Sequence, residues 1–426
     1  MSGDTIFDIT PNSSFNKQIS QVSFSNFFDN VVTRKEVENL VKCAFSPDSD
    51  LVDYHLRPYS EEKIGFLGSH LCLVVTARRP SGCEKRSFFV KTIPRDDLSQ
   101  AAYIQEKGVF KKEADFFKHV VPIMIDEFKG ESWAPRCYLA TDDTLVFEDM
   151  KLRGFANRGR SFDEATTMAA IACLARLHAS SLLAEEKLNG KSLMELYPQI
   201  LQETEFKRTT RSMVWYTVAI DLVITLAEEL GYDSSNIRRA SECVFELGLP
   251  SKTKRNVINH GDLWGSNMIF DSKDHCKLVD FQLIRYAPLA HDVMQLLYLS
   301  TSREFRQRHE QHMIDYYYAV LTECLTINSF KGDLPSFEEV MNGIEEQRLP
   351  AVVTACIFHP TVLMDGKTAG RIMNDSTTYE AYYFTRRKPF VDAIMAEDPE
   401  YEKWVRDDVR ELAEITSRMD SVPKLT

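Results

Sequence analysis

The chain has 426 residues, of which 44% are hydrophobic and 27% charged, and its formal net charge at pH 7 is −12. This composition is typical of a soluble globular protein, and the length suits one bilobal unit or two ordinary domains. The negative charge provides no basic surface for nucleic acid or anionic lipid, so we expect neither as a partner.

The start of the chain and its cysteines indicate the cellular compartment in which the protein is found. Residues 1 to about 40 form a polar leader, and Met1 to Thr5 lack the basic and apolar segments of a secretory signal. The nine cysteines are scattered without a Cys-x-x-Cys pair or a Cys/His cluster. This pattern favours free thiols in a reducing compartment over disulfides or zinc. We therefore expect a cytoplasmic protein.

Residues from about 50 to 147 have the pattern of an antiparallel sheet accompanied by one helix. A turn at residues 65–69 joins two of its strands. Gly65, Gly68 and Ser69 are candidate contacts for an anionic ligand, because glycines let backbone N–H groups approach phosphate oxygens. The spacing matches neither a G-x-G-x-x-G loop nor a P-loop, and a plain hairpin turn fits it about as well.

Lys91 is the one cation in an apolar strand at residues 87–93. On the next predicted helix, Phe110, Glu113 and Phe117 lie at positions i, i+3 and i+7, so Glu113 falls on the inward, apolar stripe. An unpaired charge at either place would be costly. We therefore predict that Lys91 and Glu113 form an ion pair. The alternative is an exposed lysine on an edge strand and a solvated glutamate.

The middle of the chain is largely helical. Ser161 and Glu164 have the spacing of a capping box that opens a long helix. His178 lies near the apolar stripe of this helix, and we interpret it as a hydrogen-bonded core residue rather than a ligand. The most apolar stretch, residues 213–227, is short for a membrane span and contains Asp221. It therefore predicts a buried bundle helix, and we expect no membrane span.

The most informative segment begins at His260. It contains Asp262, then Asn267 five positions later, then Asp280 thirteen positions after Asn267. Short apolar strands precede and separate these residues. They predict a strand-loop-strand segment that holds the three side chains in fixed positions. A simple turn with Asp280 as its cap is the alternative. The ordered set of residue types at compatible distances favours a catalytic site.

An acid, an amide and a second acid at this spacing are typical of phosphotransferases that use ATP. Asp262 has the chemistry to orient an attacking alcohol and accept its proton. Asn267 and Asp280 provide the oxygen ligands that Mg²⁺ prefers. Lys91, held by Glu113, would contact the phosphates of ATP. The sequence therefore predicts an ATP- and Mg²⁺-dependent kinase.

The spacing after Asp280 indicates the kind of acceptor. Only eleven residues separate Asp280 from Asp292, the expected N-cap of the next helix, and Gln282 stands where protein kinases have the glycine of Asp-Phe-Gly. The chain lacks an activation segment that ends in Ala-Pro-Glu. The helical region between Met150 and His260 leaves room for a dedicated acceptor pocket. We therefore expect a small hydroxylated acceptor and no protein substrate.

The segment from His260 to Asn267 resembles the catalytic loop of the aminoglycoside phosphotransferase and choline kinase group. With Trp264 and with Asp280 to Gln282 it more closely resembles the ecdysteroid kinase-like family of insects. The resemblance covers residues from about 40 to 415. It implies an α+β, bilobal protein-kinase-like fold, with an N-lobe of antiparallel sheet plus helix in residues 1–148 and a mostly helical C-lobe in residues 149–426.

The same resemblance implies a hinge at residues 145–150, where backbone groups of Glu148 and Met150 would contact the adenine edge; a simple strand end is the alternative. It also implies a steroid hydroxyl as acceptor, as in an ecdysteroid. Other hydroxylated lipophiles fit equally well. A choline-like or aminoglycoside-like acceptor, or a nucleotide-binding scaffold without catalysis, are the alternatives. Trp215, Tyr216 and residues 352–358 are candidates for lining an apolar pocket, although ordinary core explains them as well.

Overall fold

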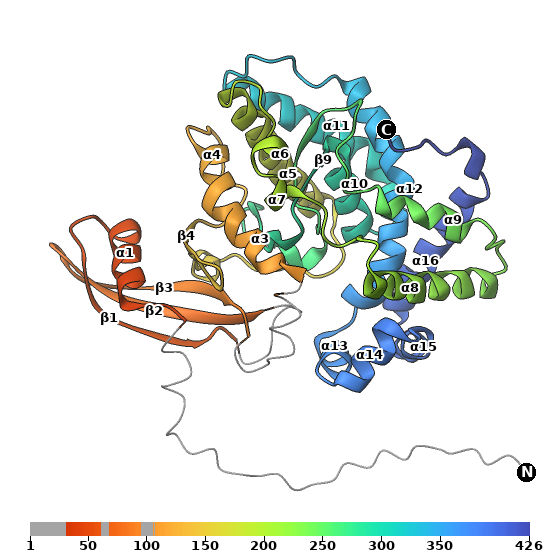
Figure 1. Ribbon diagram of the computed structural model, residues 1–426, viewed down its shortest axis with the longest axis horizontal. Helices are drawn as coiled ribbons and strands as arrows, with labels where there is room; N and C mark the ends of the chain where they lie inside the picture. Colours follow the sequence, from red (N-terminus) through yellow and green to blue (C-terminus); the bar gives the residue numbers. More distant parts are fainter. Residues whose placement is uncertain (1–30, 61–67, 95–104, 106) are drawn as a thin grey trace, which may run out of the picture.

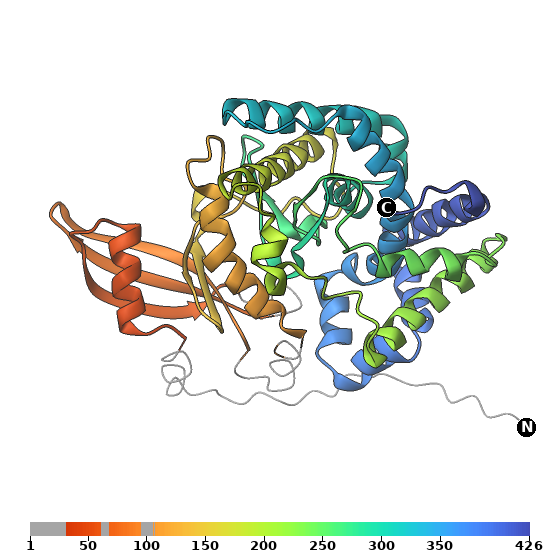
Figure 2. The ribbon, with the colours of Figure 1, turned by 45° about the horizontal axis from the view of Figure 1, so that its top comes forward.

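The fold is known from a computed structural model that describes residues 31–60, 68–94, 105 and 107–426 (Figure 1). A sheet with one helix upon it forms one part of the molecule, and a larger, mainly helical part lies beside it (Figures 1 and 2). The expected α+β class, with its antiparallel sheet before a helical region, is confirmed. Gly65 lies outside the described residues.

Five antiparallel strands make up the sheet, in the order β1-β2-β3-β5-β4. Helix α1 (Arg34–Ala44) packs against it through Val37, Leu40 and Val41, all buried. Apolar side chains on the inward face of β2 and β3 complete this small core. The strands are β1 (Asp50–Pro58), β2 (Ser69–Arg79), β3 (Gly82–Thr92), β4 (Cys137–Ala140) and β5 (Thr144–Glu148).

A continuous helical segment connects the sheet to the rest of the molecule. It consists of α3 (Val109–Asp115), the π-helical turn η1 (Phe116–Val120) and α4 (Val121–Ile125). Phe116 and Phe117 lie on its buried face, and their rings contact Phe281 of the helical part at centroid distances of 5.5 and 5.4 Å. The segment thus brings Glu113 to the boundary between the two parts.

The helical part surrounds two small antiparallel ribbons, β6 with β9 and β7 with β8. Their bounds are β6 (Asn256–Asn259), β7 (Met268–Phe270), β8 (Cys276–Leu278) and β9 (Arg285–Pro288). The helices are α5 (Glu164–Lys187), α6 (Leu193–Leu196), α7 (Pro198–Leu201), α8 (Thr210–Glu229), α9 (Ile237–Ser241), α10 (Leu289–Ser300), α11 (Arg303–Ile327), α12 (Phe337–Val362), α13 (Gly366–Met373), α14 (Ser376–Phe384), α15 (Lys388–Glu397) and α16 (Pro399–Thr416). Single turns are η2 (Met150–Arg153), η3 (Glu242–Phe245), η4 (Gly265–Asn267), η5 (Phe281–Leu283) and η6 (Met419–Ser421).

Two helix starts differ from the prediction. Asp163, not Ser161, is the N-cap of α5, and its carboxylate accepts a hydrogen bond from the Thr166 N–H (2.9 Å). The preceding Phe162 is buried and its N–H donates to the Ser300 carbonyl (2.8 Å), which fixes the chain so that the helix begins at Glu164. Asp292 is likewise not an N-cap, since α10 begins at Leu289 and Asp292 lies within its first turn.

By length and composition alone, α5 and α8 are apolar enough to cross a membrane, and the bent pair α12 and α13 passes the same test when counted together. In the fold, 83% of the most apolar 18-residue segment of α5 is buried inside the protein, whereas the corresponding share for α8 is 44%. Helix α5 therefore serves as a core element, and α11 packs along it.

Candidate functional site

Lys91, near the end of β3, lies between two carboxylates. Its amine is 2.7 Å from Glu113 Oε2 and 2.8 Å from Asp280 Oδ1. Lys91 and Glu113 are both buried, whereas 37% of the Asp280 side chain is exposed. Burial opposes the charge on Lys91, but the attraction of Asp280 and Glu113 outweighs it and raises the pKa of the amine. Lys91 is therefore a fixed cation beside a partly exposed carboxylate.

Glu113 connects the lysine to the segment that follows β8. Its second oxygen, Oε1, accepts a hydrogen bond from the Phe281 N–H (2.9 Å). Asp280 precedes this residue with a left-handed backbone, φ 65° and ψ 70°, which is uncommon for a residue with a side chain. Both oxygens of Glu113 are thus engaged, and the predicted pair with Lys91 is confirmed.

Asp262 and Asn267 lie together on the loop between β6 and β7. The Asn267 amide nitrogen donates to the Asp262 carboxylate (2.8 Å) and to the Asp262 backbone carbonyl (2.9 Å). Because its nitrogen donates these bonds, the Asn267 oxygen is the atom of this side chain with the chemistry of a metal ligand. Burial first, and then the nearby charges of Asp280 and Glu205, raise the pKa of the Asp262 carboxyl to about 7.

The loop is held by Asp292 and by His260. The Asp292 carboxylate accepts hydrogen bonds from the N–H groups of His260 and Gly261. The His260 ring accepts from the Asp262 N–H through Nδ1 (3.3 Å) and donates from Nε2 to the Val279 carbonyl (2.9 Å). Burial lowers the pKa of this imidazole, in keeping with a neutral ring that has one donor and one acceptor. These bonds fix the loop of Asp262 against the segment of Asp280.

His178 is a buried residue as expected, with its Nδ1 2.7 Å from the Tyr317 hydroxyl. Its other ring nitrogen faces Asp292 at 3.7 Å. Nearby, the Ser181 hydroxyl oxygen accepts from the Ile258 N–H (2.9 Å) and ties α5 to β6. Helix α5 therefore supports the loop from behind without contributing a reactive group.

Two further predicted groups lie near Lys91. Gly68 has φ 111°, and a Cβ placed on it would lie 3.8 Å from the Lys91 side chain, so the backbone passes directly over the lysine. The next residue, Ser69, pairs with Thr92 in the ladder of β2 and β3. On the other side of β3, Lys91 pairs with Leu145 of β5, the strand that ends at Glu148.

The predicted hinge residues lie where β5 meets η2. The Glu148 N–H donates to the Arg136 carbonyl (2.9 Å), and its side chain pairs with Arg153 (2.9 Å). The Met150 carbonyl accepts from the Phe155 N–H (3.1 Å). The predicted strand is confirmed and ends at Glu148, whereas the adenine contact of the hinge stays a prediction.

A small cavity of about 10 Å³, roughly the space of one water molecule, reaches Asp262 from the helical side. Part of its wall is apolar and part is polar. The apolar lining residues are Phe206, Leu247, Leu283, Leu299 and Phe358; the polar ones are Glu205, Arg285, His291, Gln295 and Thr354. Of the stretches proposed from sequence, Thr354 and Phe358 line this cavity. The Trp215 ring contacts the Phe358 ring at a centroid distance of 5.7 Å. Tyr216 is instead a core residue whose hydroxyl is hydrogen-bonded to Ser241.

Sequence reasoning missed the charged residues of this cavity. Arg285 on β9 is buried, pairs with Glu203 (2.7 Å) and donates to the Gly261 carbonyl (3.3 Å). Glu205 also lines the cavity, close enough to Asp262 to influence its pKa. A cation within the apolar run from Leu283 to Ala287 was the available signal, because a buried charge requires a partner.

The profile of the ecdysteroid kinase-like family matches residues 70–330. An uncharacterised kinase-like protein of Caenorhabditis elegans is 23% identical over 168 residues, which cover 37% of this chain and 41% of that protein. The chain thus aligns with less than half the length of this curated relative.

Among solved structures, the fold is similar to an ethanolamine kinase of Plasmodium vivax, with 13% identity, coverage of 88% of this chain and 87% of that chain, and a TM-score of 0.39. A spectinomycin phosphotransferase in complex with ADP and spectinomycin has 12% identity, coverage of 91% and 99%, and a TM-score of 0.41. A choline kinase of Streptococcus pneumoniae has 13% identity, coverage of 89% and 98%, and a TM-score of 0.37.

Proposed function

Since the chain belongs to the ecdysteroid kinase-like family, we propose that it is an ATP-dependent small-molecule kinase that transfers the γ-phosphate to a hydroxyl group of its acceptor. The observation that carries this proposal is that the polar and charged groups of the site lie next to one another. Lys91 contacts Asp280, Asp280 is close enough to raise the pKa of Asp262, and Asp262 contacts Asn267. Residues 189 positions apart in the chain thus meet at one point.

The residues divide into roles that phosphoryl transfer requires. Lys91, oriented by Glu113, binds the phosphates of ATP, and Asp262 orients the acceptor hydroxyl and accepts its proton. Asn267 and Asp280 fit Mg²⁺, because a carboxylate and an amide oxygen are hard ligands and stand next to Lys91 and Asp262. When bound, Mg²⁺ neutralises charge on the triphosphate.

The nucleotide lies, in this proposal, against the inner face of the sheet. Gly68 and Ser69 cover its phosphates, and Gly65 is a further candidate contact from the sequence. The adenine edge meets the segment after β5. Because the Glu148 N–H and the Met150 carbonyl already have backbone partners, the adenine contacts fall to the Glu148 carbonyl and the Met150 N–H. A boundary after Glu148 then separates a nucleotide-binding part from an acceptor-binding part.

For the acceptor, we favour a hydroxylated lipophile such as an ecdysteroid, another steroid or a xenobiotic. The apolar residues of the cavity at Asp262, among them Phe206, Leu283 and Phe358, support this choice, because apolar side chains beside polar ones bind and orient such ligands. Binding then requires the small cavity to widen. The binding partners are then ATP and this small molecule. Nine free cysteines agree with the cytosol, where ATP is present.

A cationic amino alcohol is a second candidate because of one observation. Glu205 and the rings of Phe206 and Phe358 line the same cavity, and Trp215 contacts both rings. An acid beside aromatic faces is the arrangement that binds a quaternary or protonated amine. Both candidates place their hydroxyl at Asp262, so the same residues would carry the reaction.

The proposal is tested by incubating the protein with Mg²⁺-ATP and a panel of ecdysteroids, other steroids, hydroxylated xenobiotics, amino alcohols and aminoglycosides. Mass spectrometry then detects products heavier by one phosphate. We expect phosphorylated steroid or xenobiotic products. Stoichiometric ATP binding without a product from any acceptor would instead identify a nucleotide-binding scaffold, and phosphorylation of amino alcohols alone would select the second candidate.

Replacing Asp262 by Asn should leave the fold intact and lower turnover by about 10² to 10⁴, the usual effect of a positioned base. Initial rates at saturating ATP measure turnover, and thermal unfolding checks the fold. Asp48→Asn, at an exposed position in the sheet part, is the matched control and should keep full activity. Near-normal turnover of the Asp262→Asn protein would reject the assigned role.

A further inference from the structure

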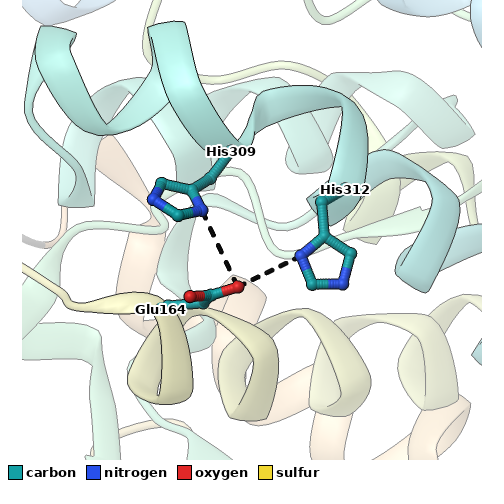
Figure 3. Close-up of side chains that lie close together, drawn as sticks. All are labelled: Glu164, His309 and His312. Carbon is teal, nitrogen blue, oxygen red and sulfur yellow. Dashed lines mark hydrogen bonds and ion pairs between the residues drawn. The ribbon is translucent and has the colours of Figure 1, made fainter.

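A second group of ligand-type side chains lies away from the nucleotide site. Glu164 in the first turn of α5 faces His309 and His312 of α11 (Figure 3). The Glu164 Oε1 atom is 3.1 Å from His312 Nδ1 and 3.7 Å from His309 Nδ1. All three ligand atoms lie within 4.8 Å of one another. Two separate helices therefore direct two imidazoles and one carboxylate to a common point.

The two oxygen–nitrogen distances are close to those of a metal site, and the two imidazole nitrogens lie within 4.8 Å of each other. In a tetrahedral zinc site with bonds of about 2.0–2.2 Å, neighbouring ligand atoms are about 3.3 Å apart. The two measured oxygen-nitrogen distances lie on either side of this value. Small rotations of exposed side chains suffice to equalise them, since 54% of the His312 side chain and 46% of the Glu164 side chain are exposed.

Local contacts hold the groups in place. His309 and His312 are three positions apart on α11, which puts both rings on one face of the helix. The His309 ring stacks on Phe305 with a centroid distance of 4.8 Å and an interplanar angle of 26°. Asp163 caps α5 through the Thr166 N–H, which fixes the position of Glu164. The backbones that carry the three ligands are thus ordered before any ion binds.

We propose that Glu164, His309 and His312 form a binding site for a divalent transition metal ion, with Zn²⁺ as the best match. Imidazole nitrogens with one carboxylate suit zinc and its neighbours, whereas Mg²⁺ and Ca²⁺ prefer oxygen ligands alone. Three protein ligands leave a fourth position for water. The bound ion connects the start of α5 to α11. The proposal is independent of the kinase reaction.

The test is a titration of untagged protein with Zn²⁺, followed by calorimetry, in excess Mg²⁺ so that the carboxylates of the nucleotide site are not available to zinc. The two exposed cysteines, Cys43 and Cys83, are first changed to Ser because thiols also bind zinc. We expect one equivalent of Zn²⁺ to bind. His312→Ala and Glu164→Gln should each weaken it by more than the roughly 10- to 100-fold that loss of an outer partner causes.

His275→Ala is the matched control. His275 also pairs with a carboxylate, Asp271, at 2.8 Å and is similarly exposed, at 48%, but a third ligand does not join this pair among the described residues. This variant should bind Zn²⁺ like the parent protein. Equal Zn²⁺ affinity in the parent, His312→Ala and Glu164→Gln proteins, or no binding to the parent, would show a hydrogen-bonded trio only and overturn the proposal.

Two further readouts do not depend on heats of binding. Zn²⁺ should raise the unfolding temperature of the parent protein, because an ion that binds only the folded state stabilises it, and should do so much less in the His312→Ala protein. Co²⁺ bound at the site should show the intense visible absorption of a four-coordinate ion. Both signals should be retained in His275→Ala, and their survival in both site variants would contradict the assignment.

Discussion

At the scale of single residues, the site rests on buried charges that stabilise one another. Lys91 and Glu113 have almost no exposed side-chain surface, and each would be costly to bury alone. Glu113 also accepts the Phe281 N–H, so its carboxylate has a partner on each oxygen. The arrangement therefore couples the position of the lysine to the segment that carries Asp280.

This coupling predicts a non-additive effect on stability. Lys91→Met should lower the free energy of unfolding by about 3–5 kcal/mol, because it leaves the Glu113 charge buried without its cation. The double variant Lys91→Met with Glu113→Gln should recover part of this loss, since Gln is neutral and still accepts from Phe281. Urea unfolding of the two single variants and the double variant measures the coupling.

An exposed ion pair serves as control for that experiment. Arg34 and Glu38 on α1 are 3.0 Å apart, with side chains 65% and 47% exposed. Arg34→Ala should cost less than about 1 kcal/mol. A Lys91→Met cost as small as that of Arg34→Ala, or a double-variant cost equal to the sum of the two single costs, would contradict the coupling.

At the scale of elements, the loop between β6 and β7 depends on one glycine. Gly261 has φ 79°, and a Cβ there would clash with the Leu283 carbonyl oxygen and lie 2.7 Å from Arg285 Nε. The loop and the segment after Asp280 therefore touch through backbone atoms. Only a residue without a side chain permits both this conformation and this approach.

Gly261→Ala should be more damaging than Gly154→Ala, which has nearly the same φ, 78°, but open space around the added Cβ. The control should lose about 1–2 kcal/mol of unfolding free energy from the left-handed backbone alone. The Gly261 variant should lose at least about 1 kcal/mol more and should also lose turnover, because the loop that holds Asp262 must move. Equal losses in urea unfolding would show that the backbone contact carries no strain.

At the scale of the whole molecule, one aromatic cluster joins the sheet part to the helical part. Phe116, Phe117 and Trp133 all contact the Phe281 ring at centroid distances of 5.4–5.5 Å. Phe281 directly follows Asp280, so the packing that unites the two parts also positions the acid of the site. Folding stability and the geometry of the site are therefore linked.

The buried His291 gives one contribution to global stability that falls in acid. Burial and the nearby Arg285 lower its pKa from 6.5 to about 4, against the opposing effects of Asp292, Gln347 and Glu203. Between these pH values the unfolded chain protonates this imidazole and the folded protein does not, so the contribution of His291 to the free energy of unfolding should fall by about 3 kcal/mol as pH drops from 6.5 to 4. Asp262, whose pKa is raised to about 7, contributes in the opposite direction over this range. Urea unfolding at several pH values, compared between the unsubstituted protein and His291→Gln, measures this contribution.

His291→Gln should remove this dependence of the free energy of unfolding on pH between pH 6.5 and 4, because the variant lacks the titrating imidazole. Comparison with the unsubstituted protein at pH 8, where the imidazole is neutral in both states, gives the packing cost of the substitution separately. If the free energies of unfolding of both proteins change equally between pH 6.5 and 4, His291 makes no such contribution.

Part of the fold and site could be predicted because the signal was local. The pairing of Lys91 with Glu113 followed from two charges on apolar stripes, and the free cysteines followed from their spacing. The start of α5 was predicted wrongly, because Ser161 and Asp163 both suit a cap and the burial of Phe162 decides between them. The charged cavity residues Glu205 and Arg285 were missed, because Arg285 meets its partner Glu203 only through folding.

The sequence by itself determined which reactive groups are present and the local order of Asp262, Asn267 and Asp280, since short-range spacing limits where a loop can place them. Only the tertiary structure decided what surrounds them. Contacts such as Lys91 with Asp280, or Glu164 with His309 and His312, join residues far apart in the chain. Such contacts depend on how buried faces pack, because packing free energy selects one arrangement among many that the same local pattern allows.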